Sequence, residues 1–238
     1  MSTRPQSAIS RSELWASTGS QVRWRRRHLP LLILRTMLQR IPFKPLDVNE
    51  LYFMEYAGIP SGDKNLQRGR VNVRRANLGD LEGLVACQNT RDAFLKRFES
   101  NDYCVVAVFD GRIVGYEWFC DKPSYVEERY ALEIAVPPDA IYAYDGFILP
   151  EHRLGGVWMK FQSVYLRELM QKLQRQRVLT TIDYGNSLSM NTHLRFGFKL
   201  VRKVFAIKIF GKSFFFKATL AKNHAALPDP VRFALRNR

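Results

Sequence analysis

The stretch with the clearest capacity for chemistry is YDGFILPEHRLGGVWMKF, residues 144–161. An apolar, strand-like run there meets a proline, an arginine and two glycines, and a helical pattern follows at once. Glycines at the N-terminus of a helix let backbone amides approach a phosphate group, and the helix dipole favours its negative charge. A glycine pair between a strand and a helix is also common in simple tight turns. The pattern alone therefore leaves phosphate binding and a plain turn both open.

Positioning such a loop requires a sheet, and the chain around it supplies one. Alternating apolar residues predict strands over 71–76, 103–109, 113–120, 129–136, 141–149, 178–183, 199–209 and 213–220. Helical spacing predicts helices over 78–86, 92–99, 156–175 and 187–195. Asp110-Gly111 is a strong signal for a hairpin turn. Antiparallel strands followed by a strand–helix–strand–helix unit predict an α/β fold with a mixed, mostly antiparallel sheet flanked by helices.

A basic extension precedes this domain, which is expected over 71–220 and is followed by a basic tail over 221–238. Residues 1–20 are rich in Ser, Thr, Arg and Gln and are predicted to be disordered. Within 21–70 we expect a basic amphipathic helix, a linker strand at 51–56 and a loop at 58–69. The helix would either pack against the domain or lie on an anionic membrane surface. Its apolar face comprises Leu31, Leu34, Leu38 and Ile41.

Composition narrows the choice of partners and compartment. Lys and Arg outnumber Asp and Glu by 37 to 22, a formal net charge of +15, which favours anionic partners. The three cysteines lack the spacing of a zinc or redox site, and their number fits no complete disulfide framework. The longest apolar stretch near the N-terminus, residues 29–34, is too short to span a bilayer. We expect a cytoplasmic protein without a metal site, peripheral to the inner membrane if the basic helix binds lipid, and see no nucleic-acid motif.

Four segments, taken in order, resemble the GNAT superfamily of acyl-CoA N-acyltransferases. VNVRRANLGDLEGL is similar to the family's opening strand and helix, and VAVFDGRIVGYEWF to its next two strands. The 144–161 stretch is similar to the acyl-CoA signature V-x-P-E-x-R-x-x-G-x-G, with matches at Ile148, Pro150, Glu151, Arg153 and Gly156. NSLSMNTHLRFGF, residues 186–198, is similar to the motif N-x-x-A-x-x-x-Y-x-x-x-G-F, with matches at Asn186, Ser189, Gly197 and Phe198. The resemblance covers about residues 71–217 and implies the GNAT fold.

The resemblance also implies a site. Acetyl-CoA or another acyl-CoA would be the co-substrate, and a small-molecule primary amine the acceptor. Main-chain groups of Phe147, Ile148 and Leu149 would bind the pantetheine arm. The loop and the second motif would complete the cofactor site with Arg153, Leu154, Gly155, Gly156, Val157, Trp158 and Asn186. Trp158 replaces the last glycine of the signature and narrows the space for the pyrophosphate.

Proton transfer has three candidates under this resemblance. Asp145 and Glu133, on neighbouring predicted strands, could each accept a proton from the amine if burial raised the pKa. His193 stands where the family usually carries a tyrosine that protonates the leaving thiolate, and an imidazole can donate a proton near neutral pH. The structural alternatives are carboxylates paired with arginines and a histidine without catalytic duty.

Two alternatives to a CoA-dependent enzyme stay open. An acidic acyl carrier protein could be the donor, because its surface would suit the basic charge of this chain. A GNAT-fold CoA-binding module without turnover is the other, supported by Trp158 and the absent tyrosine. The overall character of the motifs and the basic extension is most similar to bacterial members associated with cell-surface polysaccharide biosynthesis, which suggests an amino sugar or related precursor as acceptor. The oligomeric state is not predicted.

Overall fold

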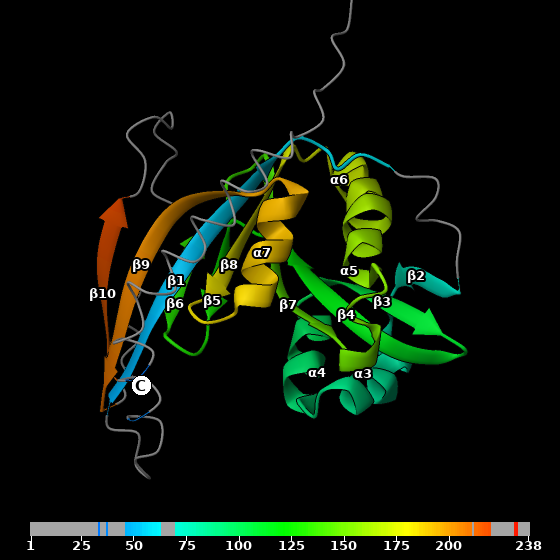
Figure 1. Ribbon diagram of the computed structural model, residues 1–238, viewed down its shortest axis with the longest axis horizontal. Coiled ribbons are helices and arrows are strands. Elements are labelled where there is room, and N and C mark those ends of the chain that lie inside the picture. Colours follow the sequence, from blue (N-terminus) through cyan, green and yellow to red (C-terminus); the bar gives the residue numbers. More distant parts are fainter. Residues whose placement is uncertain are drawn as a thin grey trace, which may run out of the picture.

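The computed structural model describes residues 46–62, 70–210, 212–219 and 231–232, together with Ile33 and Met37 (Figure 1). The predicted disordered segment, the apolar face of the basic helix, most of the loop before residue 70 and most of the basic tail lie outside these residues. Ile33 and Met37 are helical and have 51% and 64% of their surface exposed. Among the residues described, no helix is long and apolar enough to cross a membrane.

An eight-stranded sheet forms the centre of the protein, in the order β10-β9-β1-β8-β7-β4-β3-β2 (Figure 1). Neighbouring strands run antiparallel except β7 and β8, which are parallel. The predicted α/β class with a mixed, mostly antiparallel sheet is therefore confirmed. The strands are β1 (Leu46–Ala57), β2 (Val71–Arg75), β3 (Tyr103–Phe109), β4 (Arg112–Cys120), β7 (Ala140–Ile148), β8 (Arg177–Asp183), β9 (Lys199–Ile209) and β10 (Lys212–Thr219).

Strand β1 lies inside this sheet although it comes first in the sequence. It pairs with β8 on one side, where Leu51 faces Asp183, and with β9 on the other, where Val48 faces Ile207. Because both edges are bonded and both faces are covered, Leu51 and Tyr52 are only 1% exposed. The strand predicted over 51–56 is thus the second half of a longer strand inside the sheet.

Helices pack on both faces of the eight-stranded sheet, and a small second sheet lies on one of them. The helices on one face are η1 (Leu78–Asp80), α3 (Leu81–Cys87) and α4 (Arg91–Glu99), beside a small sheet of β5 (Ser124–Glu127), β6 (Leu132–Ala135) and β11 (Val231–Arg232). The other face carries α5 (Val157–Lys160), η3 (Phe161–Leu166), α6 (Arg167–Leu173) and α7 (Ser187–Phe196). The short η2 (Pro150–His152) lines a cavity together with η1 and α3. Leu84 and Phe94 pack with Trp118 in the first core, and Phe161 and Met170 pack with Phe119 in the second. Helices on both faces agree with the prediction.

Two elements differ from the sequence prediction. The strand expected over 129–136 is shorter, because residues 128–131 form a turn and only Leu132–Ala135 is extended. The long helix expected over 156–175 begins at Val157, ends at Leu173 and contains a π-helical turn, η3. Such turns are rare and are often found at functional sites.

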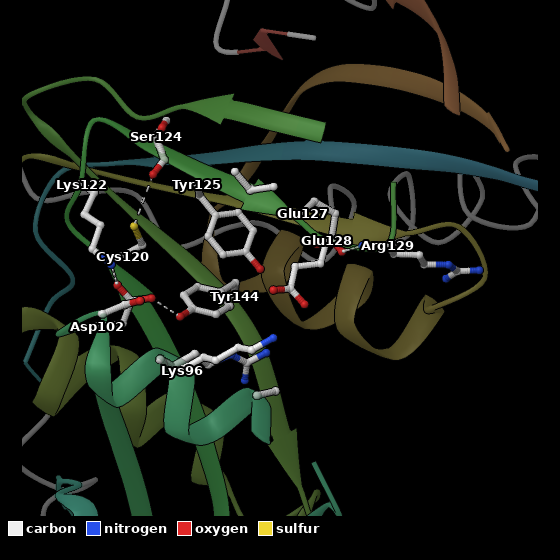
Figure 2. A pocket seen from close by; sticks show the side chains of 14 residues that line it. Lys96, Asp102, Cys120, Lys122, Ser124, Tyr125, Glu127, Glu128, Arg129 and Tyr144 are labelled. Atoms are coloured by element: carbon white, nitrogen blue, oxygen red, sulfur yellow. Dashed lines mark hydrogen bonds and ion pairs between the residues drawn. The ribbon is translucent and has the colours of Figure 1, made fainter. Parts of the chain in front are cut away.

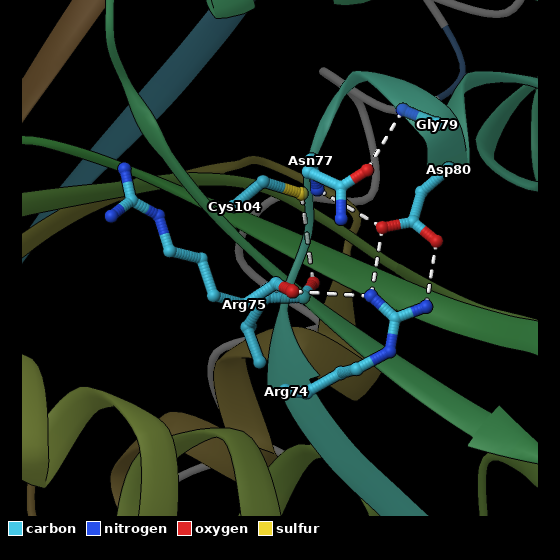
Figure 3. Close-up of polar contacts among 7 residues, drawn as sticks. Arg74, Arg75, Asn77, Gly79, Asp80 and Cys104 are labelled. Atoms are coloured by element: carbon cyan, nitrogen blue, oxygen red, sulfur yellow. Dashed lines mark hydrogen bonds and ion pairs between the residues drawn. The ribbon is translucent and has the colours of Figure 1, made fainter.

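The junction between β2 and η1 is fixed by a polar cluster (Figure 3). Arg74 donates from Nη1 and Nη2 to the two carboxylate oxygens of Asp80, at 2.7 and 2.6 Å. Asn77 caps the helix start by accepting from the Gly79 amide, and Asp80 accepts from the Asn77 amide. Because a bidentate ion pair and a capping box act together, the first helix leaves the sheet in a defined direction.

Candidate active site

A cavity opens where β7 and β8 stop pairing. Their parallel pairing ends at Ala143 and Thr180, and beyond these residues the strands diverge around a cavity of about 490 Å³. A bulge in β7 causes part of this divergence. Tyr116 faces Phe147 but Trp118 faces Tyr144, so β7 holds one extra residue opposite Glu117. Bulges bend a strand and redirect its side chains.

The bulge contains a strained residue. Asp145 has a φ of +46°, in the left-handed region that non-glycine residues rarely occupy. Such conformations cost of order 1–3 kcal/mol and persist where the surrounding structure holds them, often at active sites. Asp145 lines the cavity and forms an ion pair with Arg97 from α4. Its carboxylate already has a cationic partner.

The main-chain groups predicted for the pantetheine arm are only partly available. The Leu149 amide donates to the Val114 carbonyl of β4 at 2.9 Å, so it faces away from the open edge. The Ile148 carbonyl accepts from Arg153 Nε at 2.9 Å. Phe147 and Ile148 line the cavity, whereas Leu149 does not. A cofactor binding this edge would therefore meet Ile148 and the Arg153 guanidinium together.

The glycine loop leads directly into the helix. Gly156 has a φ of +69° and is the N-cap of α5, a conformation that favours glycine. The Gly155 amide donates to the His152 carbonyl at 3.1 Å and is used within the loop. The amides of Val157, Trp158 and the next residue lie in the first helical turn, where no intrahelical acceptor exists. The Leu154 side chain is 98% exposed.

Glu117 is the residue that sequence analysis missed. It lies on β4, lines the cavity and is only 4% exposed. Its carboxylate oxygens accept from Trp158 Nε1 at 3.3 Å and Gln162 Nε2 at 2.6 Å. Burial raises the pKa of Glu117 to about 8, although both hydrogen bonds favour the charged form. Its signal in the sequence is a lone charged residue in the apolar run of residues 113–120.

His193 lines the same cavity in a neutral form. Its side chain is buried against the rings of Trp158 and Phe198, with centroids 4.6 and 4.9 Å away. Nδ1 lies 2.8 Å from the Ser189 carbonyl oxygen, so we assign the proton to Nδ1, which donates to that oxygen. Burial lowers the pKa of His193 to about 4. Near pH 7 its Nε2 is therefore an acceptor, and the charged, proton-donating form is scarce.

The remaining predicted site residues separate into two groups. Asn186 lines the cavity and caps α7, since its side-chain oxygen accepts from the Ser189 amide at 3.2 Å. Arg153 and Trp158 also line the cavity. Glu133 lies on β6 in the small sheet, pairs in register with Val126 and is not a lining residue. The structure thus brings Asp145, His193 and Glu117 to one cavity and leaves Glu133 outside it.

Of the comparisons with known proteins, only the one with solved structures gives matches, and it concerns the fold. No family model and no curated protein matches this chain. Among solved structures it is similar to a tandem GNAT protein from the clavulanic acid biosynthesis pathway, at 13% identity and a TM-score of 0.50, over 69% of this chain and 55% of that one. It also resembles a GNAT-family protein from Novosphingobium aromaticivorans, at 14% identity and a TM-score of 0.49, over 74% of this chain and 69% of that one.

A third similar structure is smaller. The aminoglycoside N-acetyltransferase AAC(6')-Iy in complex with CoA shares 17% identity and a TM-score of 0.44, over 54% of this chain and 91% of that one. The chain spans about half the length of the tandem protein and most of the length of this one. At sequence identities this low, similarity to a solved structure is informative about the fold and not about the activity. With its sheet order, its diverging parallel strands and the tandem protein as a match, the chain has the GNAT fold.

Proposed function

We propose that this protein transfers an acyl group from acyl-CoA to a primary amine. The observation that carries the proposal is the cavity between β7 and β8, which joins an open strand edge, the N-terminus of α5 and a buried carboxyl group with a pKa of about 8. The strand edge offers main-chain groups to a pantetheine arm, and the helix N-terminus offers amides to a pyrophosphate. An acetyl or longer acyl group is our proposed acyl group, and an amino sugar is our proposed acceptor class.

The reaction is a direct transfer. The amine nitrogen attacks the thioester carbonyl carbon, a C–N bond forms, the C–S bond breaks and CoA leaves as its thiolate. The nitrogen loses one proton in the process, and Glu117 in its carboxylate form would accept it. A base whose pKa lies near the working pH is the most effective acceptor of a proton. We therefore expect activity to rise with pH through about 8.

Asp145 and His193 take secondary places in this scheme. Asp145 can serve as base only after it exchanges Arg97 for another partner. His193 stays our candidate for protonating the thiolate, although the pKa of about 4 leaves roughly one molecule in a thousand charged at pH 7. Replacing His193 by Ala should lower kcat and leave CoA affinity unchanged. An unchanged kcat would assign sulfur protonation to water.

The experiment that tests the cofactor site compares two glycines with similar positive φ values, where a valine would be strained to a similar degree. Gly156 and Gly111 have φ values of +69° and +78°, and an added Cβ meets nothing within 4 Å at either. CoA should raise the Tm of the protein, because a ligand bound only to the folded state stabilises it. Gly156→Val should remove most of the rise in Tm that CoA causes. Gly111→Val, in the β3–β4 turn, should lower the Tm of the protein but leave the CoA-induced rise unchanged.

Acyl transfer itself is measured by mass spectrometry of an amine panel incubated with acyl-CoAs of increasing chain length. A new amide product in the presence of the protein is the expected result. If CoA raises Tm but no amine is acylated by any CoA thioester, the transferase proposal fails. Dependence on an acylated carrier protein would instead assign the donor to that class.

A CoA-binding module without turnover is the second candidate, and Trp158 favours it. Its Nε1 donates to Glu117, and its ring packs on His193, so one side chain occupies both groups that would move protons. Replacing Trp158 with Gly, as in the family signature, distinguishes the two functions. If the protein is an enzyme, the wild type should show measurable acyl transfer. If it is a CoA-binding module, acyl transfer should appear only in Trp158→Gly.

We also propose that residues 21–42, which are predicted from the sequence to form a basic helix, contact anionic membrane. Basic residues near such a surface contribute about 1 kcal/mol each at low salt. Deleting residues 1–42 should abolish sedimentation with anionic vesicles. If the full-length protein does not sediment with those vesicles at low salt, the proposal is wrong.

A further inference from the structure

A second cavity, of about 400 Å³, lies on the other face of β7 (Figure 2). Helix α4 forms one wall, the β5 strand and the turn after it form the opposite wall, and Tyr144 of β7 lies between them. Figure 2 shows the rings of Tyr125 and Tyr144 one above the other, with Lys96 on the α4 side. A cavity of this size accommodates a small organic molecule.

Most charged side chains around this second cavity are already paired. Lys122 forms an ion pair with Asp102, which also accepts from the Tyr144 hydroxyl. Arg97 is paired with Asp145, and Arg129 with Asp47 and Asp183. Three charged lining residues form no ion pair within the part of the chain that the structure describes: Lys96, Glu127 and Glu128. The unpaired charge is therefore predominantly negative, on a protein whose formal net charge is +15.

Glu127 is the more enclosed of the two unpaired carboxylates. It is half-buried, whereas Glu128 is exposed, and its one hydrogen bond is a long one of 3.4 Å from the Arg129 amide. Desolvation raises the pKa of Glu127, and the amide and the charge of Arg129 offset only part of that rise. A ligand cation placed beside this carboxylate would offset more of it.

Aromatic faces surround the same position. The Tyr125 ring lies 4.6 Å from Tyr142 and 4.5 Å from Tyr144, measured between centroids. The guanidinium carbon of Arg97 lies 5.2 Å from the Tyr144 ring centroid, so the cluster already makes one cation–π contact. Aromatic faces attract cations, most strongly where water is excluded. The cavity thus combines a half-buried carboxylate that has no ion pair within the described residues with electron-rich rings.

Tyr144 connects this cavity to the proposed active site. It lines both cavities, and the next residue, Asp145, lines the first cavity while its partner Arg97 lines the second. A ligand in the second cavity would meet the Arg97–Asp145 pair on its way to the thioester position. Binding of a cationic amine there would offer Asp145 an alternative partner.

We propose that the second cavity binds a protonated amine, held by the Glu127 carboxylate and the Tyr125 and Tyr144 rings. That this amine is the acyl acceptor rests on the proposed function. The β5–β6 hairpin, which carries Tyr125 and Glu127, then selects cationic acceptors over neutral ones. Its ammonium is recognised in the charged form and gives one proton to solvent on the way to the first cavity. The neutral amine that attacks there gives the second proton to Glu117.

The test measures amine binding to the full-length protein by calorimetry, without any CoA. The probes are glucosamine, tyramine and spermidine, and N-acetylglucosamine and N-acetyltyramine are the neutral counterparts of the first two. We expect at least one cationic probe to bind more tightly than its neutral counterpart. Glu127→Gln should weaken that binding about 10- to 100-fold, the range for losing a charged hydrogen bond. Glu99→Gln, an exposed residue of α4 outside both cavities, is the control and should bind normally.

The CoA-induced rise in Tm separates this proposal from the proposed function. Both variants should keep that rise, which also shows that they fold. Amine binding without a CoA effect in the wild type would overturn the acyltransferase and retain the amine site. No preference for the cationic probes, or unchanged binding in Glu127→Gln, would overturn the amine site.

Discussion

The two cavities that meet at Tyr144 handle charge in opposite ways. In the first, Glu117 and His193 are buried with few polar partners. Desolvation raises the pKa of Glu117 and lowers that of His193, so that it favours the neutral form of both side chains. In the second, ion pairs hold four of the seven charged lining residues, namely Arg97, Asp102, Lys122 and Arg129. Burial without a counter-ion prepares a group to gain or lose a proton, whereas pairing fixes its charge. The comparison assigns proton transfer to the first cavity and charge recognition to the second.

The largest effect should come from Glu117→Gln. If Glu117 accepts the proton of the amine, kcat should fall about 10²- to 10⁴-fold, the usual contribution of a positioned base. The Gln side chain keeps an oxygen for Trp158 Nε1 or Gln162 Nε2, so CoA binding should survive. Steady-state kinetics with an amine identified by mass spectrometry provide the measurement. An undiminished kcat would move the base to Asp145, the ion-paired carboxylate of the first cavity, and break the comparison.

The pH dependence of stability tests the same burial without any substrate. A carboxyl with a pKa of 4.5 when unfolded and about 8 when folded binds its proton more tightly in the folded state. Stability should therefore fall as pH rises from about 4.5 to about 8, by up to about 5 kcal/mol. Urea unfolding at pH 5 and pH 8 should show a smaller fall for Glu117→Gln than for the wild type. Equal slopes would mean that Glu117 is solvated.

His193 should produce a slope of the opposite sign. Its pKa is 6.5 when unfolded and about 4 when folded, so the folded state resists protonation. Stability should be lost as pH falls from about 6.5 to about 4, by up to about 3 kcal/mol. His193→Gln should lessen this acid sensitivity, which is measured by urea unfolding at pH 7 and pH 4.5. If the variant is as acid-sensitive as the wild type, the imidazole is not held neutral by the protein.

The smallest effect concerns the paired side of the comparison. Arg97→Met removes the partner of Asp145 from a half-buried ion pair and should cost about 1 to 3 kcal/mol of unfolding free energy. Arg70→Met is the matched control, because Arg70 and Asp110 form a pair whose side chains are 75% and 58% exposed. Exposed pairs contribute about 0 to 1 kcal/mol. Equal losses in the two variants would show that enclosure adds nothing to the Arg97 pair.

Local pattern was sufficient to predict most elements of the fold. The hairpin around Asp110-Gly111 and the strands beside it were predicted to within a residue, because alternation and turn chemistry act over short distances. Strand β5 was missed because Ser124–Glu127 is four residues long and has no clear apolar alternation. The π-helical turn η3 leaves no mark in residue spacing and depends on packing against the sheet.

The site was less predictable than the fold. Arg153, Trp158, Asn186, Asp145 and His193 line one cavity, and their roles there stay predictions. Glu133 does not, because the turn at residues 128–131 carries its strand into a separate small sheet. The raised pKa of Glu117 depends on its burial and on its hydrogen bonds with Trp158 and Gln162, which are distant in the sequence. No local pattern reveals such a pKa.

The position of β1 inside the sheet has a consequence for the order in which the protein folds during synthesis. Leu51 leaves the ribosome long before Asp183, its partner on β8, and before Val204, its partner on β9. At about 5–20 residues per second, β1 waits on the order of 10 seconds for either neighbour. Its apolar residues are unpaired for that time, and closing so long a loop makes the pairing slow. We therefore expect nascent chains that stop before β8 to depend on chaperones.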